Sequence, residues 1–152
     1  MPTHSDSQTS PYTPKQLFIM VADVERYPEF LPWCRAARIL ERGENEMLAE
    51  LIISFNHLTE RYTSRVELHP QAEAGAASID VTMTKGPFEH LVNRWRFIPL
   101  ASGGTQIDFY LDFKFRSKLL EKLIGSVFTR ATEKMVSAFK QRADVLYGVK
   151  DL

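Results

Sequence analysis

Few of the side chains that could bind a metal or act in catalysis occur at the spacing that such a site requires. The four histidines, His4, His57, His69 and His90, show no His-x-x-x-His or His-Glu-x-x-His spacing, so a zinc site is not supported. The single cysteine, Cys34, excludes an internal disulfide and any metal site built from several cysteines. No nucleophile motif surrounds it, and we interpret it as a small buried thiol. We therefore expect no bound metal.

The carboxylates are equally poor candidates for a catalytic pair. Asp108 and Asp112 lie four residues apart on one strand face, about 13 Å at the rise of a β-strand, which is too far for coupled acid–base chemistry. Glu60 or Asp80 would act as a lone base only by pointing into a cavity, although charged side chains on strands normally face water. Glycine-rich phosphate loops and serine elbows are absent. We expect a protein that is not an enzyme, with no catalytic residues and no required cofactor.

Large apolar side chains are concentrated instead around one turn and several predicted strands. They are Phe30, Leu31, Pro32, Trp33, Phe55, Phe88, Trp95 and Phe109. Such side chains usually form the core of a domain. The alternative is that some of them line a pocket for an apolar ligand, as in most clefts for small molecules.

The elements that position these side chains begin at a helix start. Residues 1–11 are polar and form either a tail or a weak first strand. Thr13 and Gln16 make a capping box, and Pro14 suits the first helical position. Asp23 is placed to begin a second short helical segment, which the following prolines keep short.

Between about residues 35 and 115 the apolar period changes from 3.6 to 2, which is typical of strands. Short glycine-containing turns separate the alternating segments, so we expect antiparallel neighbours. A helical pattern then runs from 117 to 147 and ends near Gly148. Its apolar face is formed by Leu120, Ile124, Val127, Ala131, Met135 and Ala138, widened by Leu123, Phe128 and Phe139.

A single long helix cannot bury that apolar face alone, and the apolar face of the sheet is its obvious partner. The sequence therefore predicts an α+β fold in one domain over residues 1–152. In this fold, two short helices follow the first strand, and a long C-terminal helix lies across the concave face of a curved antiparallel sheet. A cavity forms wherever the side chains between helix and sheet are too few to fill the space.

Composition and charge narrow the function classes. The 152 residues are 44% hydrophobic and 25% charged, as in an ordinary soluble domain. No apolar run approaches the ~20 residues of a transmembrane helix, and the first 25 residues lack the features of a targeting peptide. With one cysteine, this favours a reducing bacterial cytoplasm, with peripheral contact with the inner membrane as a further option.

The charges are unevenly distributed although the net charge is zero. Residues 116–150 contain eight basic and three acidic side chains, a net charge of +5. Lys118, Lys122 and Lys134 are our candidates for contact with an anionic membrane or with RNA. The alternative is an ordinary solvated helix face.

One string of residues is similar to a known family. Leu17-Phe18, Val21-Ala22-Asp23-Val24 and the run Tyr-Pro-Glu-Phe-Leu-Pro-Trp-Cys at 27–34 resemble the N-terminal signature of the coenzyme Q-binding START-like family. The ribosome-association toxin group RatA belongs to the same polyketide cyclase/dehydrase-like superfamily. Gly86-Pro87-Phe88, Asp108-Phe109 and Ala138-Phe139 agree in order, and the resemblance covers about residues 12 to 148.

The resemblance implies a helix-grip (START/Bet v-like) fold with an apolar tunnel between sheet and C-terminal helix. It also implies a carrier or chaperone that binds ubiquinone or a similar polyprenyl lipid and supports respiratory electron transport. The first alternative is a RatA-like regulator or toxin that binds the ribosome, through its 50S subunit, and blocks subunit association. The second is a cyclase or dehydrase that uses Glu60 or Asp80. The expected cavity residues are Phe30, Pro32, Trp33, Phe55, Phe88, Leu91, Trp95, Phe109, Val127, Phe128 and Met135.

Overall fold

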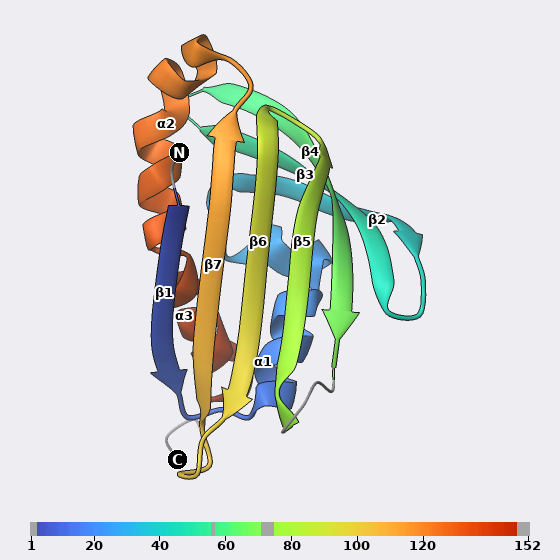
Figure 1. Cartoon of the computed structure of the whole chain (residues 1–152), viewed down its shortest axis with the longest axis vertical. Helices are drawn as coiled ribbons and strands as arrows, with labels where there is room; N and C mark the ends of the chain where they lie inside the picture. The colour runs from blue at the N-terminus through green and yellow to red at the C-terminus, as the bar shows by residue number, and fades with distance from the viewer. Residues whose placement is uncertain (1–2, 56, 71–74, 149–152) are drawn as a thin grey trace.

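The computed structural model describes residues 3–55, 57–70 and 75–148. They form a seven-stranded antiparallel sheet in the order β1-β7-β6-β5-β4-β3-β2 (Figure 1). The strands are β1 (Thr3–Ser10), β2 (Cys34–Arg42), β3 (Glu46–Phe55), β4 (Leu58–His69), β5 (Ala77–Lys85), β6 (Phe88–Pro99) and β7 (Thr105–Phe115). The helices are α1 (Pro14–Ala22), the 3₁₀ helix η1 (Val24–Glu29), α2 (Lys118–Glu133) and α3 (Met135–Tyr147).

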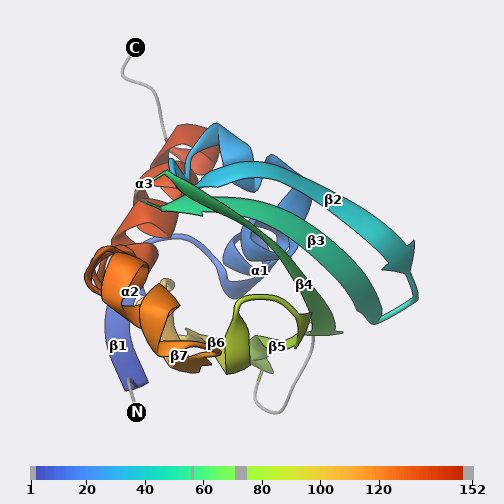
Figure 2. The same ribbon diagram turned by 90° about the horizontal axis from the view of Figure 1, so that it is seen from above.

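The sheet curves around its helices, as expected from the sequence. Seen from above in Figure 2, the strands form a bent wall, and α2 and α3 lie along its concave side. The predicted α+β helix-grip architecture is confirmed. Sequential strands from β2 to β7 pair with their neighbours because short turns join antiparallel strands.

The polar N-terminal segment forms a strand rather than a tail. All eight residues of β1 pair with β7, from Thr3 opposite Asp112 to Ser10 opposite Thr105. On the outer face the Ser7 hydroxyl donates a hydrogen bond of 2.8 Å to Asp108. Close packing at the end of this strand also requires a glycine, because a Cβ on Gly104 would lie 2.4 Å from the Ser10 carbonyl oxygen.

The start of α1 follows the sequence prediction closely. The Thr13 hydroxyl accepts a hydrogen bond from the Gln16 backbone N–H at 3.1 Å, and the Gln16 side chain accepts one from the Thr13 N–H at 2.9 Å. This reciprocal pair is the predicted capping box. Asp23 directly precedes η1 as expected, but its side chain makes no capping hydrogen bond.

The prediction of a single helix over 117–147 is wrong in one respect, because the structure has two helices there, α2 and α3, with a break at Lys134. Lys134 has φ −100° and ψ 4°, and its N–H bonds to the Ala131 carbonyl three residues back. Just before the break, the Thr132 hydroxyl donates to the Thr129 carbonyl at 2.8 Å, a local bond that bends helices. Gly125 lies inside α2 without interrupting it, and Gly148 ends α3 as predicted.

The core lies between the concave face and the helices. Phe88, Phe113 and Phe115 project from the sheet and meet Phe128 of α2, with ring centroids 4.7–5.5 Å apart. Farther along the sheet, Phe139 of α3 packs edge-on against Trp95 at 4.9 Å. Aromatic rings from helix and strand therefore set the separation of the two layers.

Candidate functional site

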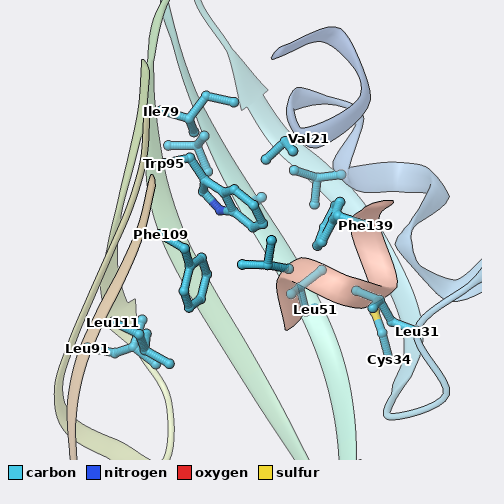
Figure 3. Close-up of a cluster of buried hydrophobic side chains, with 14 of the residues drawn as sticks. Val21, Leu31, Cys34, Leu51, Ile79, Leu91, Trp95, Phe109, Leu111 and Phe139 are labelled. Atoms are coloured by element: carbon cyan, nitrogen blue, oxygen red, sulfur yellow. The ribbon is translucent and has the colours of Figure 1, made fainter. Parts of the chain in front are cut away.

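An apolar cavity of about 110 Å³ lies between the concave face of the sheet and the helices. Every strand from β3 to β7 contributes to its wall, together with α1, η1, α2 and α3. Figure 3 shows Trp95 and Phe109 pointing from the sheet toward Phe139, with Leu51 and Ile79 beside them. Eight of the side chains expected at the cavity line it: Trp33, Phe55, Phe88, Leu91, Trp95, Phe109, Phe128 and Met135.

The other three expected residues do not line the cavity. Pro32 is exposed, and Val127 packs against the edge of the core from α2. Phe30 packs edge-on against Phe139 at 5.0 Å, and the Arg142 guanidinium lies 5.1 Å from its ring centre. Since Arg142 also pairs with Glu29 at 2.6 Å, this part of the N-terminal signature holds α3 in place rather than facing the cavity.

Aromatic contacts stiffen two sides of the wall. Trp33 stacks on Phe55 with ring centroids 5.9 Å apart, and Phe55 meets Phe128 of α2 at 5.4 Å. On the opposite side, Trp95 packs edge-on against Phe109 at 4.8 Å. Such pairs favour fixed ring orientations, so the wall keeps its shape at these two places.

Many further lining residues were not among the eleven expected at the cavity. The strand alternation that identifies inward positions would have found those on strands, because each lies on the inward face of its strand. The missed positions on strands are Ala49, Leu51, Ile53, Tyr62, Ser64, Val66, Ile79, Val81, Asn93 and Leu111. The others are Val21, Val24, Tyr27, Leu31, Ala131, Thr132 and Phe139.

A few polar groups interrupt the apolar wall. Asn93 accepts a hydrogen bond from the Trp95 indole N–H at 3.0 Å and donates one to the Tyr110 carbonyl at 3.0 Å, which fixes its amide. Ser64, on the same face of β4 as Tyr62, is a hydrogen-bond partner of the Tyr62 hydroxyl. Burial raises the pKa of Tyr62, so its phenol stays protonated. The two hydroxyls are therefore neutral groups that can donate hydrogen bonds at the cavity wall.

The carboxylates considered as possible bases lie elsewhere. Neither Glu60 nor Asp80 lines the cavity. Asp80 lies 3.5 Å from His69 and 4.0 Å from Arg94 on the outer face of the sheet. Asp112, also on the outer face, lies 3.5 Å from His90. Within the described part of the chain, no three His, Cys, Asp or Glu side chains group as metal ligands.

The three basic candidates do not form one patch. Lys118 and Lys122 are exposed on the first two turns of α2, whereas Lys134 lies at the break before α3. Sixteen residues of helix separate Lys118 from Lys134, roughly 24 Å at 1.5 Å per residue. In residues 3–55, 57–70 and 75–148 no helix is both long enough and apolar enough to cross a bilayer.

A curved antiparallel sheet that holds C-terminal helices around an apolar cavity defines the helix-grip class. Solved structures that share this fold include a START superfamily protein and an aromatase/cyclase. A START superfamily protein from Mycobacterium smegmatis has a TM-score of 0.72 at 19% identity, over 95% of this chain and 98% of that one. The Zhui aromatase/cyclase from Streptomyces sp. R1128 has a TM-score of 0.80 at 20% identity, over 94% of this chain and 93% of that one. At these identities the likeness shows the fold alone.

Residues 10–140 match the polyketide cyclase / dehydrase and lipid transport family, and the chain belongs to it. One relative is the ribosome association toxin RatA of Rickettsia prowazekii, 49% identical over 88% of this chain and 90% of its own length. Another is the mitochondrial coenzyme Q-binding protein COQ10 homolog B of Xenopus laevis, 32% identical over 98% of this chain and 61% of its own length. The family resemblance seen in the signature is confirmed.

The buried thiol beside the cavity gives a first prediction. Cys34 is 3% exposed, and burial raises the pKa of its thiol from 9.0 to about 11. At pH 8 this lowers the thiolate fraction by about a hundredfold, and the thiolate is the reactive form. We therefore expect the folded protein to react with a disulfide reagent at least about a hundredfold more slowly than the urea-unfolded chain. Similar rates in the two states would contradict the inert, buried thiol.

Proposed function

We propose that this protein binds ubiquinone or a similar polyprenyl lipid in its cavity and acts as a carrier or chaperone that supports respiratory electron transport. The observation behind the proposal is the cavity between the sheet and the helices, whose wall is mostly aromatic and aliphatic. Burying apolar surface is favourable by about 25 cal/mol per Å², which gives an isoprenoid chain strong reason to leave water. The similarity to a coenzyme Q-binding protein over nearly the whole chain supports the same conclusion.

The size of the cavity suggests how such a ligand would be held. Its volume of about 110 Å³ is roughly ten times the space that one water requires. We infer that the quinone ring of the ligand enters this space, and that a longer isoprenoid tail requires α2 to move away from the sheet. The break at Lys134 is a place where the two helices can move separately.

Hydroxyls at the wall suggest how the ring would be oriented. The hydrogen bond from Ser64 lowers the pKa of Tyr62, so the Ser64 hydroxyl is the donor and the Tyr62 oxygen the acceptor. We infer that the remaining O–H, that of Tyr62, donates to an acceptor in the cavity. A quinone presents carbonyl oxygens that accept such a bond, whereas an isoprenoid hydrocarbon presents none.

A cavity-filling substitution tests the carrier proposal. Ala131 lines the cavity from α2, so Ala131→Leu places a larger side chain where the ligand would lie. Thr129 is exposed on the same helix, and Thr129→Leu is the matched control. We expect organic extraction and mass spectrometry to recover ubiquinone from the wild-type and control proteins, and about tenfold less from Ala131→Leu. Circular dichroism checks that all three are folded.

An empty wild-type protein would contradict the proposal if it also failed to take up quinone from loaded vesicles. Equal quinone recovery from Ala131→Leu and Thr129→Leu would show that lipid binds outside this cavity. Trp33 and Trp95 both line the cavity, so quenching of their fluorescence provides an independent measure of binding.

The orientation of the ring has its own test. We expect Tyr62→Phe to weaken binding of a short-tailed ubiquinone roughly three- to tenfold, the value of one hydrogen bond. Binding of an isoprenoid alcohol without the ring should change little. Tyr110→Phe, at a partly buried tyrosine on the outer face of β7, is the control. If Tyr62→Phe weakened both ligands equally, the Tyr62 hydroxyl would have a packing role and no part in recognising the carbonyl.

A second candidate function is contact with the ribosome. The observation that favours it is the 49% identity to a ribosome association toxin, together with the basic C-terminal segment. Contact with ribosomal RNA would weaken steeply with salt, because counterions are displaced on binding. This function predicts that the protein cosediments with 50S particles at low salt and dissociates as salt is raised. No cosedimentation at low salt would exclude it.

A further inference from the structure

The first turns of α2 present apolar side chains to solvent. Leu119 is 66% exposed and Leu123 is 47% exposed. They are four residues apart and so lie on one face of the helix. The opposite face is buried through Ile124 and Phe128. This helix is therefore apolar on two sides, although only one side is covered by the sheet.

Positive charge surrounds these leucines. Arg116, Lys118 and Lys122 are all exposed, and Glu121 is the acidic residue among positions 116–123, so the segment has a net charge of +2. Lysine and arginine can extend their charged ends past neighbouring apolar groups toward phosphates. Leucines flanked by lysines are typical of helices that lie in the interfacial layer of an anionic membrane.

The position of this surface suits delivery of a lipid. In Figure 1 the first turns of α2 lie at the end of the molecule where β7 finishes. Farther along the same helix, Phe128, Ala131 and Thr132 form part of the cavity wall. A bilayer that contacted the outer face of α2 would thus be separated from the cavity by the thickness of one helix.

We propose that the first two turns of α2 dock on an anionic phospholipid bilayer, with Leu119 and Leu123 inserted and Lys118 and Lys122 at lipid phosphates. The inference rests on the proposed function, since it identifies the surface through which a carrier would meet its lipid source. The leucines favour a bilayer over RNA, because aliphatic side chains gain by leaving water for lipid and gain little on a phosphate backbone. Lys134, roughly 24 Å away along the helix, is not part of this surface.

Vesicle flotation with the full chain tests the docking surface. We expect binding to phosphatidylcholine vesicles that contain phosphatidylglycerol, and much weaker binding to phosphatidylcholine alone. Leu119→Ser with Leu123→Ser should weaken binding about tenfold or more. Its control is Val145→Ser with Leu146→Ser, an apolar pair on α3 that is 69% and 45% exposed.

The charge contribution has a matched control as well. Lys118→Glu with Lys122→Glu should weaken binding to the anionic vesicles about tenfold or more. Lys15→Glu with Lys134→Glu makes the same change in net charge at two other exposed sites and should leave binding nearly unchanged. Equal losses in the two charge variants would overturn the proposal, because they would indicate only a general electrostatic attraction.

Quinone binding in solution separates this inference from the carrier proposal. If the leucine variant binds short-tailed ubiquinone normally but not vesicles, both proposals are supported. If the wild-type protein binds vesicles through these residues but never binds quinone, the carrier proposal fails and the docking surface stands. Unchanged vesicle binding by the leucine variant overturns the docking surface. Loss of 50S cosedimentation only in the lysine variant would then assign the surface to RNA.

Discussion

Burial of the concave face of the sheet is the constraint on which the rest of the structure depends. Strands β3 to β7 present one continuous apolar surface, and every strand in the described part of the chain belongs to this one sheet, so no second sheet covers it. The helices must therefore pack against it, and large rings such as Phe88, Phe128 and Phe139 keep them at a distance. The cavity is the space that remains where smaller side chains such as Ala49 and Ala131 line the wall.

The sequence predicted the elements whose signals are local. Strand alternation and the capping box at Thr13 depend on neighbouring residues, and both appear in the structure as expected. Strand β1 was ambiguous because all eight of its side chains are polar, and it is held by backbone pairing to β7. The pattern of apolar residues did not indicate the helix break at Lys134, because the apolar face continues through Ala131, Met135 and Ala138 on both sides of it.

The candidate site, like the fold, could be predicted from the sequence only where a local pattern specifies the direction of a side chain. Inward positions on strands follow from alternation, so Phe55, Leu91 and Trp95 were placed at the cavity wall. Phe30 and Pro32 come from the turn after η1, where no periodicity specifies a direction, and they do not line the cavity. The pairing of Ser64 with Tyr62 could not be derived, because alternation shows which face a hydroxyl occupies but not whether it lies beside a cavity.

The two C-terminal helices are held by different kinds of interaction. Helix α3 is tied by polar bonds to distant segments: Arg142 to Glu29 at 2.6 Å, Tyr12 to Asp144 at 2.6 Å and Tyr147 to the Gln16 carbonyl at 2.9 Å. Helix α2 is held by Ile124 and Phe128 in the core, while its Ser117 and Thr132 hydroxyls bond to its own backbone. Moving α3 would break specific polar bonds, whereas moving α2 mainly exposes apolar surface. A lipid can cover that surface again, so α2 is the helix that the structure favours for opening the cavity.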